Sequence, residues 1–196
     1  MAFPSYGDAA KRIEEALRYK GDYMDSRGYL EGYAALINRF SILDFSKLLH
    51  VQAGAYAVYG WMPRVLTYKA SDEDCYKALG HFAVEIRGLD VRNALDKFRD
   101  TQKFAINNSV VGTSKFLHFA APNIFPIWDS KIANYFDSQP TAADDYYAYC
   151  EALHLYLPKA KWPDSFPDQL NASGVTPLRK LEFCLFRKAS DSRNKN

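Results

Sequence analysis

Apolar residues recur three and four positions apart along most of the chain, and residues that start or stop helices bound each of these runs. Strict alternation of apolar and polar residues between hairpin dipeptides does not occur in the sequence. The pattern therefore predicts an all-α protein. Its helices are expected at residues 9–20, 29–37, 45–59, 75–87, 91–106, 112–120, 130–136, 142–156 and 177–189.

Residues that favour helix starts support these boundaries. Asp129 comes directly before an expected helix, where its carboxylate can accept hydrogen bonds from free amide groups. Thr176 is followed by Pro177. Proline suits the first helical position because it lacks an N–H, and an N–H at that position makes no hydrogen bond within a helix. No repeat or linker divides the chain. We therefore expect residues 1–189 to form a single helical domain and residues 190–196 to be a disordered basic tail.

Charge is unevenly distributed along the chain, although the net charge is only +2. Six basic and two acidic residues follow Leu178, so this end carries +4 and the first 178 residues carry −2. A second local excess of +2 lies between residues 99 and 131, from Arg99, Lys103, Lys115 and Lys131 against Asp100 and Asp129. A nearly neutral protein can thus present a narrow positive track of the kind that binds a few phosphate groups.

Composition excludes several classes of protein. The chain has 196 residues, of which 48% are hydrophobic and 24% charged, as in globular proteins, and no apolar run approaches the roughly 18 residues of a membrane span. Its start lacks the features of a signal peptide, so we expect a cytoplasmic protein. Cys75, Cys150 and Cys184 form no C-x-x-C pair, and no glycine-rich nucleotide loop is present. We therefore expect no metal and no cofactor.

Residues 104–136, FAINNSVVGTSKFLHFAAPNIFPIWDSKIANYF, hold the most informative pattern. They predict a helix, a polar turn with one glycine, a second helix, a proline-containing loop, and an aspartate that starts a third helix. This order resembles the helix-hairpin-helix DNA glycosylases, in which a hairpin h-x-G-h-G joins two helices and precedes a catalytic Asp at a later helix start. The matching segments are Val111-Gly112-Thr113-Ser114 for the second half of the hairpin and Ile127-Trp128-Asp129-Ser130 for the Asp segment.

The resemblance implies a compact, two-lobed helical bundle with an active-site cleft between the lobes, and a monomer that binds double-stranded DNA. The implied activity is excision of a damaged or modified base by hydrolysis of its N-glycosidic bond, which leaves an abasic site. Asp129 would stabilise the positive charge that develops on the deoxyribose and would orient or deprotonate a water. Amide groups of the glycine-containing turn would bind a phosphate without reading sequence.

Two features of the hairpin depart from the family pattern. The first glycine is replaced by Ser109 or Val110, depending on the alignment. The lysine that attacks the sugar in bifunctional members is replaced by Ser114 or by Gly112, again depending on the alignment. Lys115 is a neighbour but is out of register, because a helix turns by about 100° per residue. We therefore expect a monofunctional enzyme that uses water, with the amine of Lys115 as the alternative nucleophile.

Other candidate residues are assigned from their places around this segment. Candidate DNA contacts are Asn108, Ser109, Val111, Gly112, Thr113, Ser114 and Lys131. Flat side chains hold an extruded base, and the candidates for such a base pocket are Tyr56, Tyr59, Trp61 and Trp128, with His118. Each assignment has a structural alternative: an aspartate that only caps a helix, an aromatic ring that only fills the core, or a histidine at the core edge.

Two further functions stay open. A non-catalytic helical module that binds DNA or another partner would keep the hairpin without needing Asp129. A purely structural helical protein would tolerate charge reversal at Lys103, Lys115 and Lys131. The excised base is also open, since damaged bases and enzymatically modified bases both suit an aromatic pocket. The 14 tyrosines favour a bulky polar modification of viral DNA, which would make the protein a factor in antiviral defence rather than DNA repair.

Overall fold

The computed structural model describes residues 2–21, 29–62, 65–101, 106, 109–164, 166–171 and 174–192. Within these ranges the regular structure is helical and contains no strand, which confirms the predicted all-α class. The α-helices are α1 (Tyr6–Leu17), α2 (Tyr29–Ser41), α3 (Leu48–Trp61), α4 (Glu73–Ile86), α5 (Val91–Thr101), α6 (Val110–Ala120), α7 (Ser130–Tyr135), α8 (Ala143–Tyr156) and α9 (Pro177–Ser192). Short 3-10 helices lie at Ala70–Asp72, Leu157–Lys159 and Asp168–Asn171.

Two helix starts are fixed by serine caps that the sequence pattern did not single out. The Ser5 hydroxyl accepts a hydrogen bond from the Asp8 amide at 3.3 Å, so α1 begins before Asp8. The Ser109 hydroxyl accepts one from the Gly112 amide at 3.2 Å, so α6 begins two residues before the expected Gly112. Both differences arise because a serine side chain satisfies an amide that would otherwise lack a partner.

The expected boundary of the basic tail is corrected by α9. We predicted disorder from residue 190, but α9 continues to Ser192. Ser190 explains the extension, since its hydroxyl donates to the Phe186 carbonyl at 2.7 Å and lies 3.1 Å from the Lys131 ammonium. Contact with α7 thus keeps this last turn helical. Residues 193–196 of the predicted tail lie outside the described residues.

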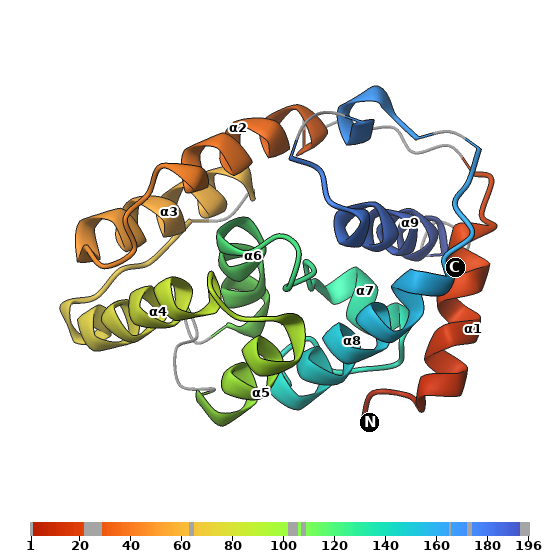
Figure 1. The fold of residues 1–196 in the computed structure, drawn as a ribbon, viewed down its shortest axis with the longest axis horizontal. Helices are drawn as coiled ribbons and strands as arrows, with labels where there is room; N and C mark the ends of the chain where they lie inside the picture. The colour runs from red at the N-terminus through yellow and green to blue at the C-terminus, as the bar shows by residue number, and fades with distance from the viewer. Residues whose placement is uncertain are drawn as a thin grey trace.

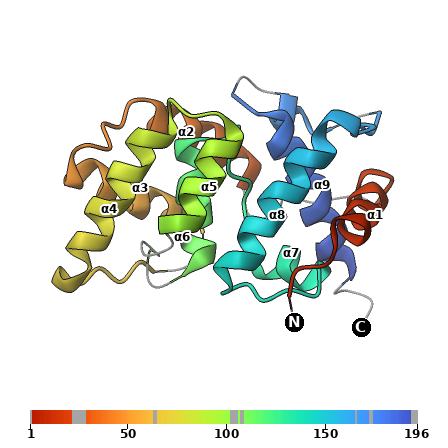
Figure 2. The same cartoon turned by 60° about the horizontal axis from the view of Figure 1, so that its bottom comes forward.

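The helices form two groups that lie side by side (Figures 1 and 2). Helices α2, α3, α4 and α6 pack on one another in the first group, and α1, α7, α8 and α9 pack on one another in the second. Helix α5 packs against α8 and so links the two groups. The chain passes from the first group to the second between α6 and α7, through the segment that ends at Asp129.

A hydrophobic core runs through both groups. Phe40, Phe116 and Phe119 pack together inside the first group, with ring centroids 5.3 to 5.5 Å apart. Trp128 and Tyr149 lie 4.8 Å apart in the second group and belong to the same continuous cluster. Most of the aromatic residues therefore serve the core, where large rings bury much apolar area.

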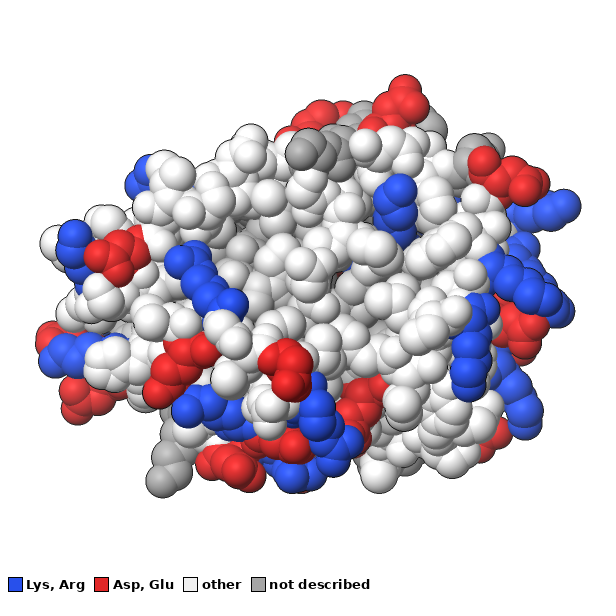
Figure 3. All heavy atoms as spheres, in the orientation of Figure 1, with Lys and Arg blue, Asp and Glu red and all other residues white. Residues whose placement is uncertain are grey.

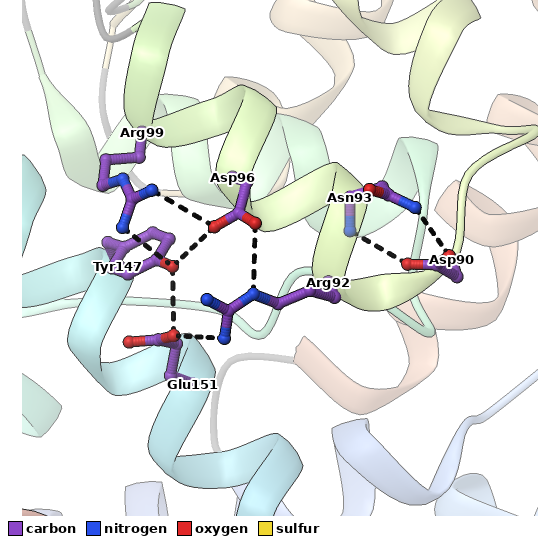
Figure 4. Close-up of polar contacts among 7 residues, drawn as sticks. All are labelled: Asp90, Arg92, Asn93, Asp96, Arg99, Tyr147 and Glu151. Carbon is purple, nitrogen blue, oxygen red and sulfur yellow. Dashed lines mark hydrogen bonds and ion pairs between the residues drawn. The ribbon is translucent and has the colours of Figure 1, made fainter.

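A polar network on the surface joins α5 to α8 (Figure 4). The Tyr147 hydroxyl lies 3.1 Å from an Asp96 carboxylate oxygen and 3.0 Å from a Glu151 carboxylate oxygen. Arg92 bridges the same two acids, at 3.1 and 3.4 Å, and Arg99 pairs with Asp96 at 3.4 Å. The network holds α5, which precedes residues 102–109 in the chain, against α8 of the second group.

Charged side chains on the face shown in Figure 3 lie mostly around its rim, most densely along the lower edge over α5 and α8. The middle of this face is largely uncharged and is hollowed near its centre, over the region between α6 and α7. None of the helices described is both long and apolar enough to cross a membrane.

Candidate functional site

Asp129 begins α7, and its carboxylate is anchored through one oxygen. Oδ1 accepts hydrogen bonds from the amides of Lys131 and Ile132, each at 2.9 Å. A cap of this kind contributes about 1 kcal/mol of stability. The side chain is partly exposed, and among the described residues no donor binds Oδ2. The cap therefore fixes the direction of the carboxylate and leaves one oxygen available for other chemistry.

The backbone before Asp129 is held by a contact with α6. The hydroxyl of Ser114 accepts a hydrogen bond from the Trp128 amide at 3.2 Å and lies 2.9 Å from the Val111 carbonyl. Trp128 is fully buried, and its indole N–H donates to the Pro140 carbonyl at 3.2 Å. Both side chains were predicted to meet DNA, but Ser114 is also fully buried. In the structure, the contacts of Ser114 and Pro140 hold Trp128 in place directly before Asp129.

His118 is a second internal support for the same segment. Its Nδ1 lies 2.7 Å from the Phe125 carbonyl, and its Nε2 lies 2.8 Å from the Tyr33 hydroxyl. Since a carbonyl only accepts, Nδ1 carries the proton and Nε2 accepts from Tyr33. Burial, with a smaller contribution from the positive charge of Arg179, lowers the pKa of His118 to about 3. The imidazole is therefore neutral and enclosed, which corrects its assignment to a base pocket.

A buried ion pair on α9 lies behind this support. Arg179 and Glu182 are 5% and 1% exposed and form an ion pair one turn apart. The Arg179 guanidinium also lies over the Tyr33 ring, 4.9 Å from its centroid. Burial raises the pKa of Glu182 to about 7, while Arg179 opposes this shift. The negative charge of Asp129 contributes in the same direction as burial.

Lys115 and Lys131, two of the described lysines, are directed toward protein groups. The Lys115 ammonium lies 2.8 Å from the Met62 sulfur, and its charge also acts on Glu182. The Lys131 ammonium lies over the Phe186 ring, 4.6 Å from its centroid, beside Ser190. Lys131 was predicted to contact DNA, but in this structure it ties α7 to α9.

The turn before α6 is only partly described, because Lys103 and the predicted contact Asn108 lie outside the described residues. The Thr113 hydroxyl accepts a hydrogen bond from the Ile106 amide at 2.9 Å and is buried. Gly112 is also buried, and a Cβ atom there would lie 2.5 Å from the Tyr59 hydroxyl. Close packing against Tyr59 thus explains why a glycine stands at this position.

Ser109 and Val111 are the partly exposed members of the predicted DNA-binding set at the start of α6. Their position at the first turn of an 11-residue helix places them where amide groups point outward. The structure therefore retains these two residues as accessible candidates.

The aromatic candidates on α3 do not share one environment. Tyr56 is 52% exposed, whereas Tyr59 is 6% exposed. Trp61 is partly buried, its indole N–H donates to the Tyr29 carbonyl at 2.9 Å, and its ring meets Phe119 edge-on at 5.4 Å. Tyr59 and Trp61 are thus engaged in packing, which leaves Tyr56 as the exposed aromatic residue of the predicted set.

Sequence reasoning missed Arg179, Glu182 and Tyr33. The signal for the first two was present, because both lie among Leu178, Leu181 and Phe183 on the strongly apolar part of α9. Opposite charges one helical turn apart on an apolar face indicate a buried pair. No comparable signal marks Tyr33, which acquires its role only from contacts with α6 and α9.

Comparison with protein-family models, with curated proteins and with solved structures found no match for this chain. In the part of the chain that the structure describes, no three His, Cys, Asp or Glu side chains are grouped so as to hold a metal ion.

Proposed function

We propose that the protein is a DNA glycosylase of the helix-hairpin-helix type, which hydrolyses the N-glycosidic bond of a damaged or modified base. The observation that carries this proposal is the state of Asp129. Its Oδ1 is fixed by two amide groups, and its Oδ2 has no donor among the described residues. A fixed, partly exposed carboxylate of this kind can stabilise a developing positive charge without reorganising.

The order of the surrounding elements supports the proposal. Helices α5 and α6 flank residues 102–109, and the chain then leads through a loop to Asp129 at the start of α7. In the proposed function α5 and α6 are the paired helices of the DNA-binding element. The first turn of α6, with the partly exposed Ser109 and Val111, then offers amide groups to a DNA phosphate. The hollow between α6 and α7 (Figure 3) is the proposed entrance for the extruded nucleotide.

The proposed reaction uses the two carboxylate oxygens of Asp129 differently. As the C1′–N bond breaks, its electron pair leaves with the base and the sugar gains positive charge, which the carboxylate stabilises. Water then adds to C1′, and Oδ2 receives the proton that this water loses. The departing base takes up a proton from solvent, so that the products are the free base and an abasic site.

Water is favoured over a lysine as the nucleophile. The Lys115 ammonium lies against the Met62 sulfur and interacts with the charge of Glu182. The contact with Met62, which is buried, engages the Lys115 amine within the protein. The proposal therefore predicts an abasic product without strand cleavage.

The test is a base-release assay over duplexes that contain oxidised, alkylated, deaminated or bulky hypermodified bases, with mass identification of each product. Asp129→Asn keeps a capping oxygen and removes the charge, so it is expected to reduce release by at least a hundredfold from at least one duplex. Asp90→Asn is the matched control, because Asp90 caps α5 through the Asn93 amide at 2.9 Å and is exposed. Salt-sensitive DNA binding without release from any duplex would instead favour the non-catalytic module.

A further inference from the structure

Helix α3 presents an apolar stripe to solvent, although α2, α4 and α6 all pack on this helix. Leu49 is 75% exposed and Tyr56 is 52% exposed. Gly60 is exposed as well, and Ala53 is partly exposed. Successive members are four, three and four positions apart, so all of them lie on one face of the helix. Together these four residues form the α3 stripe.

Helix α3 also lacks the charged side chains that usually border an exposed helix face. Its 14 residues, LLHVQAGAYAVYGW, contain no Asp, Glu, Lys or Arg, whereas every other described α-helix contains at least one of these residues. Single exposed apolar residues are common on monomeric proteins, but a contiguous apolar face is typical of an interaction site. The α3 stripe is therefore suited to an apolar surface and not to the phosphates of a nucleic acid.

The α3 stripe is complementary in shape to itself. Two large residues, Leu49 and Tyr56, alternate with two small ones, Ala53 and Gly60. If a second copy of α3 lies antiparallel with its Gly60 facing Leu49, the same register brings its Ala53 to face Tyr56. Each large side chain then faces a small one, which lets the two helix axes approach to about 8 Å. This match of sizes favours a second copy of the chain as the occupant.

The space that the register needs is open at Gly60. Among the described residues, nothing lies within 4 Å of a Cβ atom placed there. The Leu49 side chain of the other copy can therefore fill this notch without displacing part of its own chain.

Electrostatics also favours the antiparallel arrangement. A helix carries partial positive charge at its N-terminus and partial negative charge at its C-terminus, so an antiparallel pair places opposite partial charges side by side. No charged side chain of α3 would lose its water, because α3 has none. The 14 residues of α3 span about 21 Å, and one such pair buries less than the roughly 1,200 Å² of a standard interface. The contact is therefore expected to be weak and reversible.

We propose that two copies of this chain associate through their α3 helices, packed antiparallel about a two-fold axis midway along the helix. Both copies contribute the same surface, so the assembly closes as a dimer. The exposed ring of Tyr56 then lies against Ala53 of the other copy. The inference goes beyond the proposed function and does not depend on it, because Asp129 and the first turn of α6 contribute nothing to this interface.

Sedimentation equilibrium of the full chain without DNA measures the association. We expect a monomer–dimer equilibrium with a dissociation constant on the order of 10–100 μM. Leu49→Glu buries a charge in the interface and is expected to weaken the association at least tenfold. Leu155→Glu is the matched control, because Leu155 is 59% exposed on α8, and it is expected to change nothing. A protein that stays monomeric at about 500 μM, or a Leu49→Glu variant that associates as tightly as the control, would overturn the proposal.

A compensating pair of substitutions tests the register. Gly60→Leu alone sets two leucines face to face and is expected to weaken the association at least tenfold. Leu49→Ala combined with Gly60→Leu exchanges the large and the small residue, so this double variant is expected to regain most of the lost affinity. Both positions are exposed, so circular dichroism should show that each variant is folded. An association that the double variant does not recover contradicts the antiparallel register.

Other occupants of the α3 stripe would give different results. If a membrane were the occupant, the protein would bind vesicles of phosphatidylcholine and phosphatidylglycerol, lose this binding in Leu49→Glu and form no dimer in solution. If DNA were the occupant, Leu49→Glu would lower DNA affinity at protein concentrations far below those of the dimer. Either result overturns the proposal, whereas a failure to release any base leaves the dimer intact and refutes only the proposed activity.

Discussion

The Ser114 hydroxyl and the Trp128 amide form a buried hydrogen bond of 3.2 Å between α6 and the residue before Asp129. This bond links the middle of α6 to the residue before the cap of α7, although the two residues are 14 positions apart. It explains how a short irregular segment can hold Asp129 in a fixed place. Both residues are fully buried, so water cannot replace this bond.

Ser114→Ala is expected to destabilise the protein by about 1–3 kcal/mol, because the Trp128 amide would be buried without a partner. Urea denaturation measures this change. Ser41→Ala is the control, since the Ser41 hydroxyl is exposed and only bonds the Asn38 carbonyl, and it should cost less than about 0.5 kcal/mol. Equal stability of the two variants would show that the hydrogen bond to Trp128 does not hold this segment.

Gly112→Ala is expected to destabilise the protein, because the added Cβ would lie 2.5 Å from the Tyr59 hydroxyl. The overpacking cost of about 1–3 kcal/mol exceeds the gain of about 1 kcal/mol that alanine brings to a helix. Tyr59→Phe removes the clashing oxygen, so Gly112→Ala should cost less in that background. Gly60→Ala provides the comparison, since nothing lies within 4 Å of its added Cβ, and it should be stabilising. An equal cost of Gly112→Ala in both backgrounds would contradict the packing explanation.

His118 is expected to make the free energy of unfolding fall as the pH decreases from about 6.5 toward 3. The folded protein keeps this imidazole neutral, with a pKa of about 3, whereas the unfolded chain takes up a proton near pH 6.5. The contribution to the slope is at most about 1.4 kcal/mol per pH unit. His118→Gln retains one donor and one acceptor but does not titrate, so it should lack this contribution. Ring signals of His118 that titrate near pH 6.5 in the folded protein would contradict the account.

Tyr147→Phe tests whether the surface network between α5 and α8 affects DNA affinity as well as stability. Loss of the hydroxyl removes contacts with Asp96 and Glu151, at 3.1 and 3.0 Å. Because Arg92 still bridges both acids, the expected cost is about 1 kcal/mol or less, and it should shrink at high salt. DNA affinity at fixed salt should be unchanged. A large loss of affinity would mean that the setting of α5 against α8 controls the DNA-binding element.

The sequence predicted the helices because their signals are local. Apolar spacing located α4 and α5, and Asp129 correctly marked the start of α7. The ends were less predictable, since they depend on contacts that spacing does not contain. Ser190 extends α9 because it meets Lys131, a residue 59 positions away.

The positions of several predicted site residues have a single physical origin. A motif specifies which residues follow one another but not which of them face the interior. Ser114, His118 and Trp128 all belong to the informative segment, yet each is fully buried and supports Asp129 from inside. Glu182 lies outside that segment, on α9, and its burial beside Arg179 was not predicted.

The central proposal is that the Asp129 carboxylate stabilises the positive charge that forms on the sugar as a glycosidic bond breaks. Single-turnover base release tests this proposal most directly. The measurement compares Asp129→Asn with Asp90→Asn on the duplex from which the unaltered protein releases a base fastest, with both variants checked for equal DNA affinity. The account predicts that release by Asp129→Asn is at least a hundredfold slower and that Asp90→Asn matches the unaltered protein. Equal release by all three proteins would contradict it.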